Sequence, residues 1–91
     1  MEHTSALHFL ISGKVQNVFY RRFCQTQAQR LNLSGWARNL DDGRVEIKVY
    51  GDITALEIFE KKLWQGPMLA NVTDILAEKI LFESYEGFDV F

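Results

Sequence analysis

Two kinds of hydrophobic spacing follow each other in the first part of the chain. The run at residues 6–12 is apolar and of strand length, and it places alternate residues on one face: Leu7, Phe9 and Ile11. Residues 13–17 then have the composition of a loop. From about residue 19 the spacing becomes helical, with one apolar stripe: Tyr20, Cys24, Ala28 and Leu31. Residues 32–34 end this predicted helix.

A hairpin is predicted next along the chain. Residues 35–40 and 44–50 are expected to form its strands, joined by an Asp-Asp-Gly turn at residues 41–43. The later strand alternates two kinds of residue: Val45, Ile47 and Val49 with Glu46, Lys48 and Tyr50. This alternation predicts one buried face and one face in contact with water.

A second helix should begin at residues 51–52, with Asp52 or Thr54 as its N-cap. The Gly-Pro pair at residues 66–67 should end it. Its core-facing positions share helical spacing: Leu56, Phe59 and Leu63.

The complete order of elements predicts the fold class. Residues 71–82 contain a fourth strand, and residues 88–91 add a short terminal one. The resulting β-α-β-β-α-β order is typical of an α+β, ferredoxin-like sandwich, in which two helices cover one face of an antiparallel sheet. We expect one domain over residues 1–91, with residues 1–5 as a flexible tail.

Composition adds constraints on the class of protein. The chain has 91 residues, of which 47% are hydrophobic and 24% charged, as in a folded globular domain. Cys24 is the only cysteine, which excludes an intrachain disulfide and a cysteine-based zinc site. No apolar run approaches the roughly 20 residues needed to span a bilayer. These features predict a reduced, soluble, cytoplasmic protein.

Charge is distributed unevenly along the chain. Residues 1–40 carry a net charge of +4 and residues 41–91 a net charge of −6, and no carboxylate lies between His3 and Leu40. A solvated basic surface would explain this, but such a segment is also where an anion site is expected. The whole chain is net acidic, which argues against nonspecific nucleic-acid binding.

The first predicted helix begins with Arg21 and Arg22, although the positive end of a helix usually carries acidic residues. The loop at residues 13–18 leads from a strand straight into this helix start, where backbone N–H groups can converge on a phosphate-like group. Two exposed arginines at a frayed helix end remain the alternative.

Two linked motifs carry a resemblance to a known family. The stretch Gly-Lys-Val-Gln-Asn-Val-Phe-Tyr-Arg at residues 13–21 resembles the acylphosphatase signature Gly-Arg-Val-Gln-Gly-Val-aromatic-aromatic-Arg. Residues 35–39 (Gly-Trp-Ala-Arg-Asn) and the Asp-Gly pair at residues 42–43 are similar to its second part, at the family's spacing. The resemblance covers nearly the whole chain.

This resemblance implies an enzyme that hydrolyses the carboxyl-phosphate bond of acyl phosphates, without a metal or a cofactor. It implies two catalytic residues, with Arg21 gripping the phosphoryl group and Asn39 orienting the attacking water. The phosphate-binding residues would act with Arg21 through their backbone N–H groups: Val15, Gln16, Asn17, Val18, Phe19 and Tyr20.

The implied chemistry needs little more than positioning and charge stabilisation, because the leaving group is a stable carboxylate. Neither the stretch at residues 13–21 nor the one at residues 35–39 contains a His, Asp or Glu that could act as a base, and we expect His8 to be a strand-surface residue. The expected ligands are small acyl phosphates, with inorganic phosphate or sulfate as competitors. Nucleic acid and membranes are not expected partners, and a monomer is expected. A noncatalytic anion-binding or regulatory module on the same fold is the alternative function.

One position departs from the family pattern, because Asn17 stands where the signature has its second glycine. Asparagine tolerates a left-handed backbone, so the loop could keep its shape, while its side chain could crowd the phosphate. We therefore predict an enzyme of reduced or altered activity. Cys24 is predicted to be a buried hydrophobic residue rather than a nucleophile, and Trp36 to serve packing.

Overall fold

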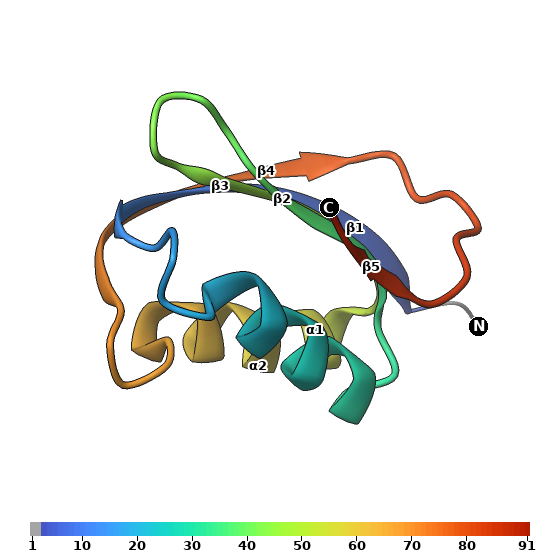
Figure 1. Cartoon of the computed structure of the whole chain (residues 1–91). Coiled ribbons are helices and arrows are strands. Elements are labelled where there is room, and N and C mark those ends of the chain that lie inside the picture. The colour runs from blue at the N-terminus through green and yellow to red at the C-terminus, as the bar shows by residue number, and fades with distance from the viewer. Residues whose placement is uncertain (1–2) are drawn as a thin grey trace.

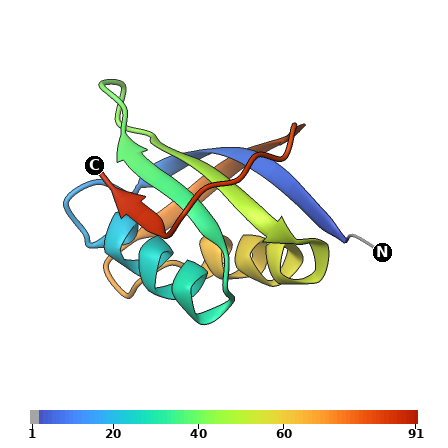
Figure 2. The same ribbon diagram turned by 90° about the vertical axis from the view of Figure 1, so that its right-hand side faces the viewer.

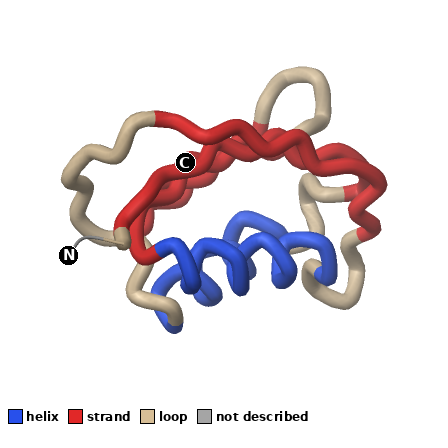
Figure 3. Tube along the Cα trace, turned by 180° about the vertical axis from the view of Figure 1, so that it is seen from behind, coloured by secondary structure: helices blue, strands red, loops and turns tan. Residues whose placement is uncertain are grey.

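The computed structural model describes residues 3–91, which form one curved sheet with both helices beneath its concave face (Figures 1 and 3). The two layers follow from the residue patterns, because each helix has a single apolar stripe that must be covered by the sheet. The elements in chain order are β1 (Thr4–Lys14), α1 (Tyr20–Arg30), β2 (Ser34–Asn39), β3 (Val45–Asp52), α2 (Ile53–Gln65), β4 (Asn71–Ile80) and β5 (Phe88–Val90).

The sheet has the strand order β4-β1-β3-β2-β5. Its first four strands pair antiparallel, as the element order predicts, but β5 pairs parallel with β2. The reason is that the last residue of β4 and the first residue of β2 lie at the same end of the sheet. Residues 81–87 cross from β4 to β2 at that end, so β5 starts beside Gly35 and runs in the direction of β2 (Figure 2).

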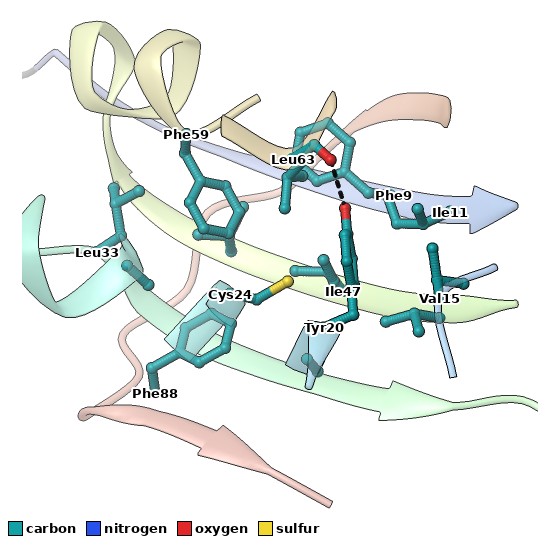
Figure 4. Close-up of a cluster of buried hydrophobic side chains, with 14 of the residues drawn as sticks. Phe9, Ile11, Val15, Tyr20, Cys24, Leu33, Ile47, Phe59, Leu63 and Phe88 are labelled. Carbon is teal, nitrogen blue, oxygen red and sulfur yellow. Dashed lines mark hydrogen bonds between the residues drawn. The ribbon is translucent and has the colours of Figure 1, made fainter. Parts of the chain in front are cut away.

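The core lies between the sheet and the helices, and it contains the predicted stripes. The buried residues of α1 and α2 are those expected from helical spacing: Tyr20, Cys24 and Ala28, and Leu56, Phe59 and Leu63. The Tyr20 hydroxyl donates a 2.7 Å hydrogen bond to the Leu63 carbonyl oxygen, which joins the two helices inside the core (Figure 4).

The outer face of the sheet is less open than the β3 pattern predicts. Tyr50 is only 2% exposed, because the segment after β4 folds over it. Its ring packs against Phe82 and Tyr85, and its hydroxyl donates a 2.9 Å hydrogen bond to Glu83. Burial and the nearby Glu83 carboxylate raise the pKa of Tyr50 to about 12. The predicted contact with water is therefore wrong at this end of β3.

The ordered sheet extends closer to the N-terminus than predicted. β1 begins at Thr4, and the His3 carbonyl accepts a 2.8 Å hydrogen bond from the Ile53 backbone N–H. The predicted tail at residues 1–5 is therefore wrong for Thr4 and Ser5, because pairing with β3 fixes them. Its first two residues lie outside the described range. Within residues 3–91, no helix is long and apolar enough to cross a membrane.

Candidate active site

The candidate loop begins where β1 leaves the sheet. The pairing of β1 with β4 shifts register between Ser12 and Gly13. Gly13 has a φ of 123°, and a Cβ atom there would lie 2.1 Å from the Asn71 carbonyl oxygen. Only glycine fits this close approach to β4. The chain can therefore turn out of the sheet and toward α1.

Two left-handed residues shape the loop at residues 15–19. Asn17 has a φ of 62° and Phe19 a φ of 65°, so the expected left-handed backbone is present at Asn17. Val15 and Val18 hold the loop to the core, with 1% and 4% exposure. Within residues 3–91, none of the backbone N–H groups of residues 15–22 donates a hydrogen bond to another protein group.

The start of α1 lacks the usual means of stabilising a helix N-terminus. Its first turn contains no acidic residue, and its N-cap Phe19 makes no side-chain hydrogen bond to the helix. By contrast, the carboxylate of Asp52 caps α2 by accepting from the Thr54 N–H at 2.8 Å. Among the described residues, the positive end of α1 thus has neither an acidic residue in its first turn nor a side-chain cap, as the sequence predicts.

A hollow of about 380 Å³ lies at this helix start. Five of the predicted phosphate-site residues and two others line it: Val15, Asn17, Phe19, Tyr20, Arg21, Arg22 and Val90. β5 points toward the start of α1 (Figure 2). The Arg21 guanidinium donates a hydrogen bond from Nη1 to the Phe91 carbonyl oxygen, which holds the arginine beside the end of β5.

The loop is joined to the β2–β3 hairpin through Gln16. Its side-chain amide nitrogen donates to the carbonyl oxygens of Leu40 at 2.8 Å and Arg44 at 3.0 Å. The side chain of Gln16 thus points away from the hollow and toward the residues that follow β2. The predicted contribution of Gln16 and Val18 to phosphate binding involves their backbone N–H groups alone.

Asn39 lies at the end of β2, next to this junction. Its Oδ1 atom is buried and, among residues 3–91, is the one buried side-chain nitrogen or oxygen without a hydrogen-bond partner. Such an atom costs roughly 1–3 kcal/mol unless something else bonds to it.

The pairing of β2 with β5 puts Asn39 near the hollow. Ala37 pairs with Val90 and accepts a 3.0 Å hydrogen bond from the Phe91 N–H. Asn39 is two residues further along β2, so it projects to the same face as Ala37, toward the helix layer. Asn39 itself is not among the residues that line the hollow. It lies on β2 two residues beyond the partner of Val90 and directly before Leu40, which accepts from Gln16.

Arg38 belongs to the opposite face of the sheet. Its Nε donates a 2.6 Å hydrogen bond to Glu46, which also bonds to His8 at 2.7 Å. Its guanidinium lies 5.4 Å from the centre of the half-buried Trp36 ring. Burial raises the pKa of Glu46, but the bonds from His8 and Arg38 outweigh it, so that pKa lies below the ordinary value. His8 is thus a partner of Glu46 on the sheet surface.

The buried ionisable groups of α1 are poorly suited to nucleophilic chemistry. Burial raises the pKa of the Cys24 thiol far above its ordinary value, and the thiol points into the core (Figure 4). Burial and the neighbouring Cys24 likewise raise the pKa of Tyr20. The prediction of Cys24 as a buried hydrophobic residue is confirmed. Within residues 3–91, no three His, Cys, Asp or Glu side chains gather so as to hold a metal ion.

Two lining residues of the hollow, Arg22 and Val90, are not among the site residues that the family resemblance implies. The position of Arg22 beside Arg21 at the helix start was a signal for the first of them. Nothing local could have revealed Val90, because it reaches the hollow only through the parallel pairing of β5 with β2.

Comparisons with known proteins agree with this arrangement. The acylphosphatase family model matches residues 7–90. An acylphosphatase from Nitrosococcus oceani is 42% identical over 81 residues, which make up 89% of this chain and 91% of that protein.

Solved structures show the same similarity in three dimensions. The structure of an acylphosphatase from Coxiella burnetii matches with a TM-score of 0.94 and 37% identity, covering 98% of this chain and 94% of that one. The crystal structure of acylphosphatase from Bacillus subtilis matches with a TM-score of 0.92 and 34% identity, covering 94% and 97%. The similarity therefore extends over the whole fold as well as the two motifs.

Proposed function

This chain belongs to the acylphosphatase family and is a hydrolase, and on that premise we propose how its residues bind and hydrolyse an acyl phosphate. The phosphoryl group binds at the start of α1, held by Arg21 and by the N–H groups of residues 15–20. The observation that carries this proposal is the set of N–H groups at residues 15–22 that donate to no group of residues 3–91. Together with the positive end of α1, they suit an anion with several acceptor oxygens.

Arg21 adds charge and geometry to this cradle. Its planar guanidinium can donate two parallel hydrogen bonds to phosphate oxygens. Its bond to the Phe91 carbonyl restrains the side chain at the hollow before substrate arrives. Restraint of this kind reduces the conformational entropy that binding would otherwise cost.

Asn39 orients the water that attacks phosphorus. Its buried Oδ1 atom lacks a partner among the described residues, and an ordered water molecule would satisfy it by donating a hydrogen bond. The same amide can fix the direction in which the water's lone pair points. A purely structural asparagine at a strand end would have no reason to keep this acceptor free.

The reaction then needs one displacement. The water oxygen forms a bond to phosphorus in line with the bond that breaks, and the acyl carboxylate leaves with that bond's electron pair. One proton of the water passes to an oxygen of the leaving carboxylate or of the phosphate product, and then to solvent. Because a carboxylate is a stable leaving group, neither a covalent intermediate nor a metal ion enters the proposal. The donors around the phosphoryl group stabilise its charge in the transition state.

The test is phosphate release from benzoyl phosphate in the presence of EDTA. We expect rapid turnover by the wild type. Asn39→Ala should lose about 10²–10³-fold in kcat, the usual effect of losing one such group. It should still bind inorganic phosphate. Arg21→Gln should lose both turnover and phosphate binding.

Arg30→Gln serves as the matched control, because Arg30 is an exposed arginine in the last turn of the same helix. It should leave turnover unchanged. A wild type that binds phosphate through Arg21 without hydrolysing the substrate would contradict the catalytic proposal and favour an anion-binding module. Loss of phosphate binding in Asn39→Ala would contradict its assignment to the water.

We propose that inorganic phosphate and sulfate compete with the substrate, because both match the anion cradle. We also propose a monomer that acts in the cytoplasm on small acyl phosphates. Competitive inhibition by both anions and a mass near 10.6 kDa in light scattering would support these statements. A dimer at working concentration would contradict the monomer.

A further inference from the structure

The outer wall of the hollow carries two exposed apolar residues. Phe19 is 71% exposed and Val90 is 37% exposed, and both line the hollow that contains Arg21. They come from separate parts of the chain, the loop before α1 and the terminal strand β5. The hollow therefore combines a cationic, hydrogen-bonding side with an apolar side.

Phe19 is exceptional in its backbone as well as its exposure. A bulky residue with a φ of 65° is an outlier, and a glycine would adopt this conformation without strain. Its neighbours Val18 and Tyr20 are both buried, so the ring of Phe19 alone points out of the core. It also occupies the N-cap of α1, where Ser, Thr, Asp or Asn is preferred. A residue that departs from all three rules is best explained by contact with a ligand.

The covalent structure of an acyl phosphate places its acyl group in the hollow that Phe19 and Val90 line. The acyl carbon is separated from phosphorus by a single oxygen atom, so the acyl group must begin inside the same hollow. The volume of about 380 Å³ lies within the range of small-molecule pockets and exceeds what a phosphoryl group requires.

We propose that Phe19 and Val90 form a subsite for the acyl group, and that the enzyme favours acyl phosphates whose acyl group is aromatic. This inference rests on the proposed function, since it assigns the other half of the same substrate. The Phe19 ring is available to stack against a substrate ring. The Val90 methyl groups cover a second side of the acyl group and exclude water from it.

The test compares benzoyl phosphate with acetyl phosphate, which differ only in the acyl group. The quantity measured is the ratio of their kcat/KM values in each variant, relative to the wild-type ratio. This comparison cancels the difference in intrinsic reactivity between the two substrates. It also cancels any effect of a substitution on the phosphoryl cradle, which both substrates share.

Phe19→Gly removes the ring while keeping the left-handed backbone free of strain. We expect it to lower the benzoyl-to-acetyl ratio about tenfold, as expected for loss of an apolar contact to the substrate. Phe19→Tyr keeps the ring and should stay within about twofold of the wild-type ratio. Val90→Thr keeps the shape of the side chain but makes it polar, and it should lower the ratio roughly threefold.

Trp64→Ala is the control for an exposed aromatic residue, since Trp64 is 47% exposed and lines a different hollow on α2. It should leave the ratio unchanged. Equal losses on both substrates in Phe19→Gly would overturn the subsite, because the residue would then act only through the loop. An unchanged ratio with full activity would overturn it as well.

A second readout separates this inference from the proposed hydrolysis. Benzoylphosphonate and acetylphosphonate resemble the two substrates but have no bond that water can cleave in this way. Calorimetric titration should show tighter binding of benzoylphosphonate, and Phe19→Gly should remove this preference. A wild type that hydrolyses neither substrate would contradict the proposed function, and the phosphonate preference would then decide the subsite by itself. Equal affinity for the two phosphonates would overturn the subsite.

Discussion

At the residue scale, Asn17 combines two effects that oppose each other. Its left-handed backbone, at a φ of 62°, preserves the loop whose N–H groups face no protein acceptor. Its side chain also lines the hollow in which the phosphoryl group is proposed to bind. Glycine would give the same backbone and leave that space open. Asparagine in place of the family's glycine therefore changes the space for substrate more than it changes the backbone conformation.

We predict that Asn17→Gly raises kcat/KM for acyl phosphates by roughly fivefold, which corresponds to about 1 kcal/mol in transition-state binding. The gain comes from removing a side chain that crowds the phosphoryl group. Steady-state hydrolysis of benzoyl phosphate is the measurement. An unchanged kcat/KM would show that the asparagine side chain does not impede the reaction.

Asn17→Ala provides the comparison. Alanine also shortens the side chain, but it is strained at a positive φ and should reduce the free energy of unfolding by about 1 kcal/mol. Urea unfolding of the two variants would separate the backbone effect from the effect on activity. If the alanine variant were as stable as the wild type, the positive φ at residue 17 would not strain an alanine.

At the element scale, the site depends on how the loop and β2 are held together. α1 begins without a cap, and the loop before it is held to the core by Val15 and Val18. The Gln16 side chain connects this loop to the hairpin turn after β2 through its two hydrogen bonds. A second connection runs from Arg21 through Phe91 to Ala37 of β2. The placement of the proposed phosphate cradle relative to Asn39 therefore depends in part on one glutamine.

We predict that Gln16→Ala lowers kcat/KM about tenfold, because loosening this connection misplaces the attacking water. The loss in unfolding free energy should be only about 1 kcal/mol, since Leu40 and Arg44 also accept backbone hydrogen bonds. Enzyme kinetics and urea unfolding measure the two effects. Gln65→Ala, at the exposed C-terminal end of α2, should change neither quantity. A tenfold loss of activity in both variants would contradict the positioning role.

At the scale of the whole molecule, the sheet separates two chemical environments. The helix-facing side holds the apolar core and the N-terminus of α1, whereas the opposite side carries the ionic group of His8, Arg38 and Glu46. Glu46 is bonded by side chains from two different strands, which ties β1, β2 and β3 together across the outer face. Because its pKa is lowered in the folded protein, its contribution to stability depends on pH.

We predict that Glu46→Gln destabilises the protein near neutral pH by about 1–2 kcal/mol, through loss of charged hydrogen bonds. A carboxylate with a lowered folded pKa stabilises fully above its ordinary pKa of about 4.3. This stabilisation disappears as the pH falls through the lowered folded pKa. The two proteins should therefore converge in stability on the acid side.

Thermal unfolding of both proteins across the acid range measures this convergence. Glu57→Gln, a change at an exposed carboxylate on α2, should follow the wild type throughout. A stability difference for Glu46→Gln that stayed constant down to strongly acidic pH would contradict the stabilisation by the Glu46 carboxylate.

The helices, the strands and the family could be predicted from the amino-acid sequence, because each depends on patterns among neighbouring residues. The stripe of Tyr20, Cys24 and Ala28 and the alternation at the start of β3 reflect which faces are buried, and neighbouring residues suffice to recognise each pattern. The signature at residues 13–21 likewise indicates the loop, because it is recognised from a run of consecutive residues. The lack of an acidic residue at the start of α1 is equally a local feature.

Features that depend on contacts between distant segments became evident from the three-dimensional structure. The burial of Tyr50 needs the segment after β4 to fold over the sheet, and Val90 reaches the hollow through a parallel strand pair. The free acceptor of Asn39 and the exposed ring of Phe19 are also invisible in the sequence, because a residue's unmet contacts become evident only when all of its neighbours are in place.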